Sequence, residues 1–195
     1  MKALIVYCHP VEGSFCSALR DAARRGLERA GHDVSVIDLA AESFDPVMRH
    51  EEWDVYMSHA GTVPEALTKH AAVLSEAEIM VFVYPTWWSG VPAQLKGWFE
   101  RVLVPGVGFR LDERQRVRPG IANARHLHAV TTYGSPKTYV RLVNDNGRRL
   151  IGRALRLAMV HRPKLVHHGL YRMDKATDDD RRAFLNRIEA RMSRL

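Results

Sequence analysis

The residues best suited to chemistry lie in three short stretches, and the first is His9-Pro10-Val11-Glu12-Gly13-Ser14. It follows an apolar run and precedes a helical pattern that contains Ser17. Free backbone N–H groups at a helix N-terminus, together with these hydroxyls, suit a bound phosphate. Ser14 could equally be only a helix cap, and His9 could be an ordinary core residue. The chain has no G-x-G-x-x-G and no Walker lysine, so the common dinucleotide and triphosphate loops are absent.

The other two stretches follow later apolar runs. In Pro85-Thr86-Trp87-Trp88, two adjacent tryptophans stand in a loop that closes at Pro92. Flat aromatic rings and exposed backbone amides suit a flat ligand with polar edges, although each tryptophan could equally cover the core or a subunit contact. Thr131-Thr132-Tyr133-Gly134 offers hydroxyls and a glycine that permits close backbone approach, and a tight turn alone would also account for it.

Five apolar segments predict the strands that position these stretches. We expect the strands at residues 3–8, 33–39, 79–84, 127–132 and 164–170, and helices at 14–31, 65–75, 92–102, 147–160 and 177–192. This alternation predicts an α/β fold, a three-layer doubly wound parallel five-stranded sheet with the flavodoxin-like order 2-1-3-4-5. Ligands of such sheets bind outside the carboxyl ends of the strands, so the three stretches should meet at one site.

Composition limits the function classes. With 195 residues, 46% of them hydrophobic and 26% charged, one globular domain over residues 1–195 is expected. The net charge of +7 comes largely from arginines scattered over the first and last predicted helices, which favours a solvated surface over nucleic-acid binding. No apolar run approaches the ~20 residues of a membrane span, so no membrane insertion is expected.

Cysteine and histidine usage is ordinary. Cys8 and Cys16 match no standard redox or metal spacing, and no signal peptide is apparent, so a cytoplasmic location is expected. Two histidine pairs at strand spacing could in principle form a zinc site, but no cysteine joins them and a structural or surface role is favoured. These histidines are His126, His128, His167 and His168.

The order and spacing of the motifs resemble the flavodoxin-like NAD(P)H dehydrogenase (quinone) family, the NAD(P)H:quinone oxidoreductases. The resemblance covers nearly all of the chain and fades after about Pro136. It is carried by His9-Pro10, Ser14-Phe15, Thr131-Thr132 and, most specifically, Pro85-x-x-Trp88-x-Gly90-Val91-Pro92-Ala93-x-Leu95-Lys96-Gly97-Trp98-Phe99-Glu100-Arg101-Val102. It implies an enzyme in which NAD(P)H delivers a hydride to N5 of a flavin, FAD or alternatively FMN, and a quinone-like acceptor then takes the two electrons in a ping-pong sequence.

The resemblance also implies roles for particular residues. Those expected to bind the cofactor are His9, Ser14, Phe15, Cys16, Pro85, Thr86, Trp87, Trp88, Thr131, Thr132, Tyr133 and Gly134. Cys16 stands where an asparagine is usual, and Tyr133 replaces one of two paired glycines, so its ring would narrow the pocket or stack on the flavin. Trp88 and Tyr139 are the expected catalytic residues, with Tyr139 stabilising the reduced flavin. The histidine that partners such a tyrosine has no match near Asn144 and Asp145.

The resemblance implies partners as well. A homodimer is expected, because the family closes its pocket with a second subunit. The long connection 41–63 would supply aromatic cover across that interface or be buried in its own core, through Phe44, Trp53, Tyr56 and Met57. The alternative function is a regulatory or ancillary flavoprotein that binds a membrane transport partner. An electron-carrier flavodoxin is disfavoured by the basic charge and the tryptophan loop, and a phosphoacceptor domain is disfavoured because the first strand ends in Cys8-His9 rather than in carboxylates.

Overall fold

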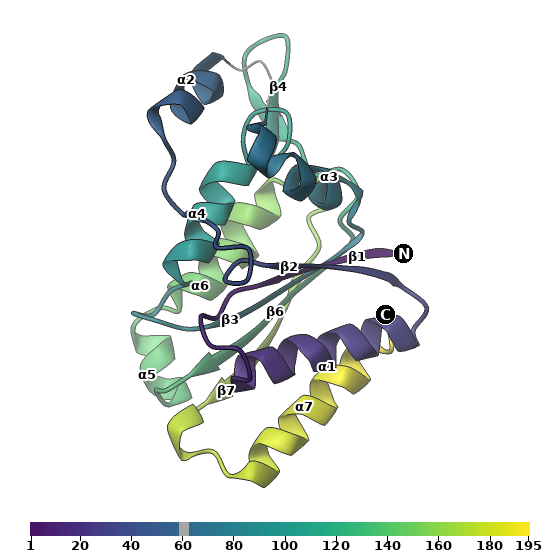
Figure 1. The fold of residues 1–195 in the computed structure, drawn as a ribbon, viewed down its shortest axis with the longest axis vertical. Coiled ribbons are helices and arrows are strands. Elements are labelled where there is room, and N and C mark those ends of the chain that lie inside the picture. Colours follow the sequence, from purple (N-terminus) through teal and green to yellow (C-terminus); the bar gives the residue numbers. More distant parts are fainter. Residues whose placement is uncertain (59–62) are drawn as a thin grey trace.

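The computed structural model describes residues 1–58 and 63–195, and its centre is a five-stranded parallel sheet. The strands are β1 (Lys2–Tyr7), β2 (Asp33–Asp38), β3 (Ile79–Pro85), β6 (His126–Tyr133) and β7 (Leu165–Tyr171), in the order β2-β1-β3-β6-β7 (Figure 1). Because β6 and β7 are the fourth and fifth strands of this sheet along the chain, the order is the predicted 2-1-3-4-5. The flavodoxin-like α/β fold is therefore confirmed.

Helices cover both faces of the sheet (Figure 1). On one face lie α1 (Phe15–Arg29) and α7 (Asp178–Met192), which pack so closely that a Cβ atom on Gly26 would lie 2.4 Å from the Glu189 carbonyl oxygen. Arg25 and Arg29 both pair with the Glu189 carboxylate across this contact. The Thr177 cap of α7 forms the full capping box with Asp180, as the acidic first turn predicts.

The opposite face is covered by α3 (Thr68–Glu76), α4 (Ala93–Val102) and the helical segment after α5. Buried Trp98 and Phe99 of α4 pack on Phe82 of β3, with ring centroids 6.2 Å and 5.3 Å from that ring. The connection after β2 runs directly against α4, because a Cβ atom on Gly97 would lie 2.3–2.5 Å from atoms of Pro46. Glycine at 97 is thus required by this close approach.

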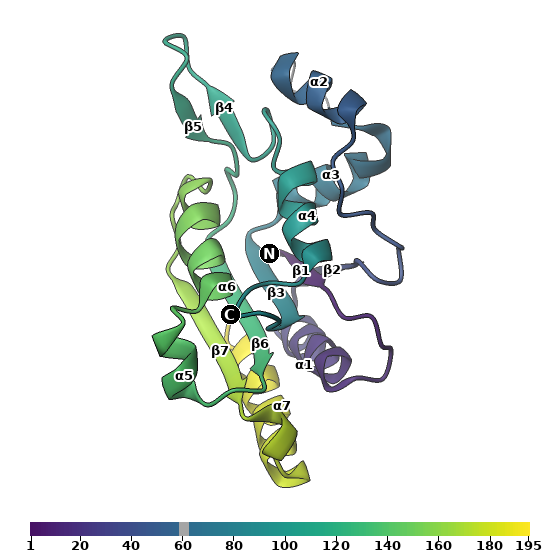
Figure 2. The same cartoon turned by 90° about the vertical axis from the view of Figure 1, so that its left-hand side faces the viewer.

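Several elements had no predicted bounds, although some helix was expected in the long connection. The long connection contains α2 (His50–Ser58), which buries none of its described side chains, and residues 59–62 of that connection lie outside the described residues. The segment after α4 forms a hairpin of β4 (Phe109–Leu111) and β5 (Val117–Pro119), at the same end of the molecule as α2 (Figure 2). A 3-10 turn, Glu65–Leu67, precedes α3, and another, Met173–Lys175, precedes α7. Of the residues offered as aromatic cover, Phe44 is buried in the core, whereas Trp53 and Met57 are exposed.

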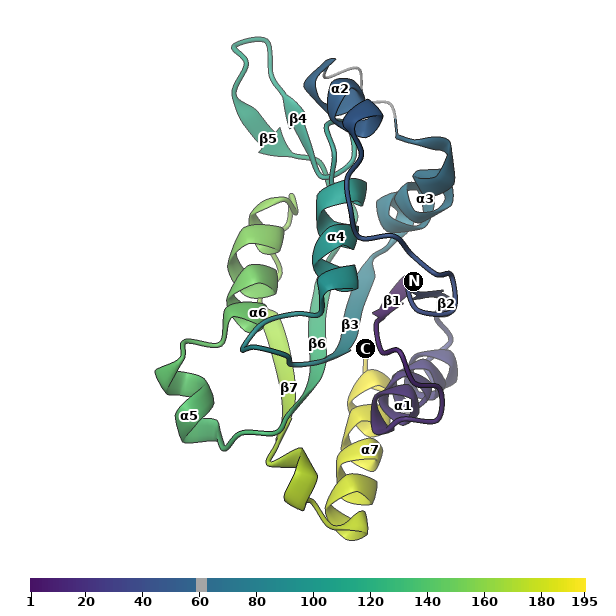
Figure 3. The same ribbon diagram turned by 60° about the vertical axis from the view of Figure 1, so that its left-hand side comes forward.

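The segment after β6 is also more broken than predicted. A short α5 (Lys137–Leu142) precedes α6 (Asn146–Arg149), which continues as a π-helix over Leu150–Leu155. The predicted helix 147–160 therefore exists as α6, the π-helix and a last short turn. Figure 3 shows α5 and the loop from β3 to α4 on the same side of the molecule, beyond the ends of β3 and β6. Among the described residues, no helix is both long and apolar enough to cross a bilayer.

Candidate cofactor site

The three predicted stretches meet at the carboxyl edge of the sheet. The Thr86 amide donates to the Thr132 carbonyl oxygen at 2.9 Å, and the hydroxyl oxygens of Thr86 and Thr131 are 2.9 Å apart. The Sγ atom of Cys16 lies 3.7 Å from Oγ1 of Thr132, and the rings of His9 and Trp87 have centroids 6.2 Å apart. Parallel strand pairing causes this convergence, since Pro85 of β3 is in register with Thr132 of β6.

The loop after β1 is held by its own side chains. Ser14 caps α1, because its Oγ accepts the Ser17 amide at 3.2 Å while the Ser17 hydroxyl donates to the Ser14 carbonyl oxygen at 2.6 Å. The Nδ1 atom of half-buried His9 bonds to Val11 of the same turn, so His9 belongs to the loop rather than to the core. Helical geometry leaves the N–H groups of the first turn without intrahelical acceptors. The capped helix start therefore still presents donors and a positive dipole end to an anion.

Phe15 and Cys16, in the first turn of α1, pack inward. The Phe15 ring contacts the Phe184 ring of α7 at a centroid distance of 6.5 Å. Cys16 is buried beside Thr132, and this burial raises the pKa of its thiol to about 11. Cys16 is therefore a neutral thiol at neutral pH, and its contribution is packing and hydrogen bonding rather than nucleophilic chemistry.

Trp88 stands on a tight turn at the edge. Trp87 and Gly90 exchange two backbone hydrogen bonds of 3.2 Å and 3.0 Å around Trp88 and Ser89, whose φ angles are 48° and 59°. Positive φ at both central residues is the mark of a type I′ turn, which usually carries glycine or asparagine. The Trp88 side chain is fully exposed, so no packing within the chain offsets this unfavourable backbone conformation.

A cavity of about 310 Å³ opens beside this turn. It brings the two predicted catalytic residues together, because Trp88 and half-exposed Tyr139 both line it. The complete lining is Thr86, Trp88, Ser89, Tyr133, Gly134, Ser135, Tyr139, Val140 and Asp145. Eight predicted residues are not part of this lining and lie in the adjoining loops, the strand ends and the first turn of α1. They are His9, Ser14, Phe15, Cys16, Pro85, Trp87, Thr131 and Thr132.

Tyr133 forms an inner wall of the cavity. Its hydroxyl donates to Oδ2 of Asp145 at 2.9 Å and lies 2.8 Å from Nε2 of His167. Its ring stacks on the Tyr171 ring, with centroids 4.7 Å apart and planes 9° apart. Burial raises the pKa of Tyr133 far above its usual range, so the hydroxyl stays protonated. Two roles were expected of the Tyr133 ring, narrowing the pocket or stacking on the flavin. Its place in the cavity wall is compatible with the first role, and one face of the ring already stacks on Tyr171.

Asp145 was given no role in this site, and His167 was considered only as a possible zinc ligand. Asp145 has φ 38°, and its Oδ1 accepts the Arg148 amide at 3.2 Å, which caps α6. Asn144 and Asp145 were considered only as possible sites for a histidine, so a carboxylate at this position received no role. His167 could not be linked to them, because its contact with Tyr133 depends on the pairing of β6 with β7.

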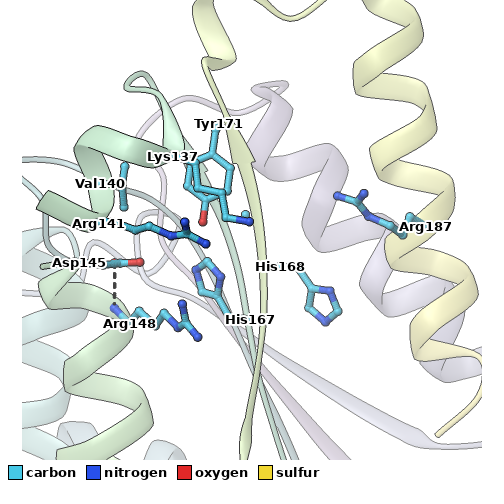
Figure 4. A pocket seen from close by; sticks show the side chains of 10 residues that line it. Lys137, Val140, Arg141, Asp145, Arg148, His167, His168, Tyr171 and Arg187 are labelled. Carbon is cyan, nitrogen blue, oxygen red and sulfur yellow. Dashed lines mark hydrogen bonds between the residues drawn. The ribbon is translucent and has the colours of Figure 1, made fainter.

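A basic cleft of about 490 Å³ adjoins the cavity and shares Val140 and Asp145 with it. Lys137, Arg141 and Arg148 gather with His167 on one side of β7 (Figure 4). His168 and Arg187 lie on the other side of that strand in the same view. The prediction of scattered, solvated arginines agrees with the ion-paired Arg25 and Arg29 of α1, but it missed this concentration of cations.

The four histidines considered for zinc are divided between two environments. The rings of His128 and His168 stack with centroids 5.6 Å apart, and Nδ1 of His128 lies 3.3 Å from Nε2 of His168. His167 bonds to Tyr133 on the other face, since successive residues of a strand point to opposite sides. Within residues 1–58 and 63–195, no three His, Cys, Asp or Glu side chains are grouped as metal ligands would be.

The donors at this edge fit a flavin. The capped start of α1 offers amides to a phosphate, and the hydroxyls of Thr86, Thr131 and Thr132 lie at the strand ends beside the cavity. Buried Tyr84 at the end of β3 has a hydroxyl without a hydrogen-bond partner among the described residues. Fold and site thus define a flavodoxin-like α/β protein with a ligand edge suited to a flat, phosphate-bearing molecule.

Comparison with known proteins identifies the family of the chain. Residues 1–191 match the family described as flavodoxin-like fold. NAD(P)H dehydrogenase [quinone] 1 of Cavia porcellus is 32% identical over 154 residues, which cover 71% of this chain and 55% of that relative. Ribosyldihydronicotinamide dehydrogenase [quinone] of Homo sapiens is 30% identical over 169 residues, covering 75% of this chain and 70% of the relative.

The solved structure of Smu.1420 from Streptococcus mutans UA159 superposes with a TM-score of 0.86 and 28% identity over the whole of both chains. The chain belongs to the flavodoxin-like fold family and, within it, to the group that contains the NAD(P)H dehydrogenases (quinone). It spans little more than half the length of the Cavia porcellus relative.

Proposed function

We propose that this chain is a flavin-dependent NAD(P)H oxidoreductase that transfers two electrons to a quinone-like acceptor. One observation carries the proposal: the capped start of α1, the threonine hydroxyls at the strand ends and the cavity of Trp88 and Tyr139 lie together at one sheet edge. The names of the relatives, a quinone dehydrogenase and a ribosyldihydronicotinamide dehydrogenase, support the same class of reaction.

Each loop has a part in the proposed site. Amides of the first turn of α1, with Ser14, would bind the flavin phosphate, and His9 would shape that loop through its bond to Val11. The residues Pro85, Thr86, Trp87, Trp88, Thr131, Thr132, Tyr133 and Gly134 would border the flavin ring. Trp88 would cover the ring, and the Tyr139 hydroxyl would donate to it and stabilise negative charge. Phe15 and Cys16 would hold the start of α1 in place through their contacts with Phe184 of α7 and Thr132 of β6.

When bound, the flavin would supply hydride transfer at N5, first from NAD(P)H and then, in a ping-pong sequence, to the acceptor. FAD is the proposed form and FMN the alternative. The protein's part is to hold the ring between Trp88 and the threonines and to exclude water from it. The cavity of about 310 Å³ is at the small end for ligand sites. It would admit one substrate ring at a time against the bound flavin, as a ping-pong sequence requires.

We propose that residues 1–195 act as one flavin-binding unit in a homodimer. Fully exposed Trp88 and half-exposed Tyr139 line the cavity, and a second subunit would cover them together with half-exposed Trp87 of the same loop. Sedimentation measured at several protein concentrations tests this assembly, and a monomer at all of them would refute it. A cytoplasmic location is the matching proposal, supported by the free thiols of Cys8 and Cys16.

The function is tested by purifying the protein and recording its visible spectrum. We expect flavin absorption, release of FAD or FMN on denaturation, and quinone-dependent oxidation of NADH or NADPH. Thr132→Val should raise the Kd for flavin about tenfold, because it removes a hydroxyl at the strand end. Thr68→Val, at the start of α3, is the control and should leave this Kd unchanged. A protein that is colourless and binds neither added FAD nor added FMN would refute the proposal.

A further inference from the structure

A chain of three hydrogen-bonded side chains connects the cavity of Trp88 and Tyr139 with the basic cleft. Asp145 lines the cavity and also the adjoining end of the cleft, and its Oδ2 accepts a hydrogen bond from the Tyr133 hydroxyl at 2.9 Å. The same hydroxyl lies 2.8 Å from Nε2 of His167, which lines the basic cleft. Both distances are those of well-formed hydrogen bonds, so the three groups form a continuous path.

The proton positions in this path follow from counting donors. A tyrosine hydroxyl has one proton, and Tyr133 donates it to Asp145. Its oxygen must therefore accept from His167, which fixes the Nε2–H tautomer and leaves Nδ1 as the acceptor. Burial lowers the pKa of His167 to about 4, so the ring is neutral at neutral pH and this tautomer is populated.

The charged and titratable groups around the path come from five elements. Arg148 of α6 and Lys137 of α5 disfavour a charged His167, whereas Asp145 favours it. Arg141 of α5 lies in the same cleft, and Arg187 of α7 and His168 face it from the other side of β7. Tyr84 of β3 and Tyr171 of β7 are the other titratable groups close to Tyr133. Burial, with Arg148 and Lys137 acting in the same direction, thus keeps His167 neutral at the end of the path.

We propose that His167, Tyr133 and Asp145 form a relay that delivers one proton from water in the basic cleft to an acceptor in the cavity. Nδ1 of His167 takes a proton from water, Nε2 gives its proton to the Tyr133 oxygen, and the Tyr133 hydroxyl gives its proton to the Asp145 carboxylate. The Asp145 carboxyl then protonates an oxygen of the bound quinone-like acceptor. Reduction of a quinone to a hydroquinone requires one hydride and one proton, and the relay supplies that proton. To restore the starting arrangement, the Tyr133 hydroxyl turns its proton back toward Asp145, and His167 loses the proton on Nδ1 to water in the cleft and gains one on Nε2 from it.

The test uses two acceptors, because the inference rests on the proposed function. A quinone must be protonated, whereas ferricyanide accepts electrons without a proton. His167→Gln keeps an N–H donor to Tyr133 but cannot carry a proton, and Tyr133→Phe removes the connecting hydroxyl. We expect each variant of the flavin-loaded protein to lose at least about tenfold in kcat with quinone and to keep ferricyanide reduction, since positioned acid catalysis contributes about 10²-fold or more. His168→Gln, the neighbour on the other face of β7, is the matched control.

A second measurement requires no turnover. In the purified protein labelled with ¹⁵N at histidine, NMR should show His167 as the Nε2–H tautomer. Asp145→Asn should lower the pKa of His167 further, because it removes the carboxylate that favours the imidazolium. The Nδ1–H tautomer in the wild type, or an unchanged pKa in Asp145→Asn, would overturn the path.

The outcomes separate the two proposals. If the wild type oxidises NAD(P)H with neither acceptor, the proposed function is wrong. If it reduces both and His167→Gln reduces quinone at the wild-type rate, the relay alone is wrong. Equal losses with both acceptors would also overturn the relay, since they indicate a merely structural role for the network.

Discussion

The Sγ atom of Cys16 lies 3.7 Å from Oγ1 of Thr132, so the thiol at the start of α1 faces the end of β6 rather than solvent. Cys8, the other cysteine, is buried at the end of β1, and burial raises the pKa of each thiol to about 11. Thiols of this kind form almost no thiolate at neutral pH.

We therefore expect neither cysteine to react with a disulfide reagent in the native protein. Both should react once the chain is unfolded in guanidinium chloride, and counting the released chromophore checks this. Rapid reaction of native wild-type protein that disappears in Cys16→Ala would contradict the buried position of Cys16.

Trp88 combines an unfavourable backbone conformation with a fully exposed side chain. Trp88→Gly should raise the free energy of unfolding by up to about 1 kcal/mol, because glycine adopts a positive φ without strain although it also gives the unfolded chain more freedom. The same variant should bind flavin more weakly if Trp88 covers the ring. Urea unfolding and flavin titration measure the two effects. Leu142→Gly, at another exposed position, is the control and should not stabilise the fold.

The stacked pair His128 and His168 should make stability depend on pH. Burial lowers the pKa of His128 to about 3 and that of His168 to about 4, from 6.5 in the unfolded chain. Below about pH 6.5 the unfolded chain binds protons that the folded pair does not, so stability falls as the pH falls toward 4. The loss is at most about 1.4 kcal/mol per pH unit for each histidine.

This dependence is measured by urea unfolding at about pH 7 and pH 5. The double variant His128→Gln/His168→Gln should lose less stability between the two values than the wild type. Exposed His161→Gln serves as the control and should behave like the wild type. An identical loss in the double variant would show that other groups cause the acid sensitivity.

An ion pair helps to attach α2 to the rest of the molecule, beside the contact of Tyr56 with Phe109 of β4. Both oxygens of the Glu52 carboxylate bond to the Arg101 guanidinium of α4, and both side chains are largely buried. Glu52→Gln should therefore loosen α2 and speed chymotrypsin cleavage after Trp53 or Tyr56 several-fold, with little change in the urea midpoint. Glu51→Gln, one residue earlier, should leave the cleavage rate unchanged, and equal rates for the two variants would refute the role of this pair.

The basic cleft predicts a preference for the more highly charged co-substrate. Because the cleft shares Val140 and Asp145 with the cavity, its cations can reach phosphates of a nicotinamide nucleotide seated there. Arg148→Gln should raise KM for NADPH several-fold more than KM for NADH. Arg153 lines a neighbouring cleft but not this one, so Arg153→Gln should change the two values equally. A parallel rise for both nucleotides in Arg148→Gln would contradict the prediction.

The central sheet could be predicted because buried parallel strands are continuous apolar runs, as β3 shows with all seven residues buried. The convergence of the Ser14, Trp88 and Thr132 segments followed from the strand order alone. The hairpin β4–β5 could not be predicted, since each strand has only three residues, too few for an alternating pattern to stand out. The π-helix has the same apolar spacing as an ordinary helix and is indistinguishable from one in the sequence.

The polar network was invisible for another reason. Asp145 and His167 lie 12 and 34 residues from Tyr133 in the sequence. Asp145 reaches Tyr133 from the start of α6, and His167 reaches it through the register of β6 and β7, which pairs Tyr133 with Tyr171. No local pattern encodes such a contact. The exposed position of Trp88 was likewise not predictable, because the alternative of core burial was equally compatible with an aromatic residue in a loop.

The contrast between Trp88 and Trp98 has a practical consequence. One indole is surrounded by water at the rim of the site, and the other is enclosed between α4 and the sheet. The two indoles should therefore differ in the wavelength of their emission maximum and in their accessibility to dissolved quenchers. With Trp53 and Trp87 replaced by phenylalanine, the emission of Trp88 would report flavin binding and the emission of Trp98 would report unfolding.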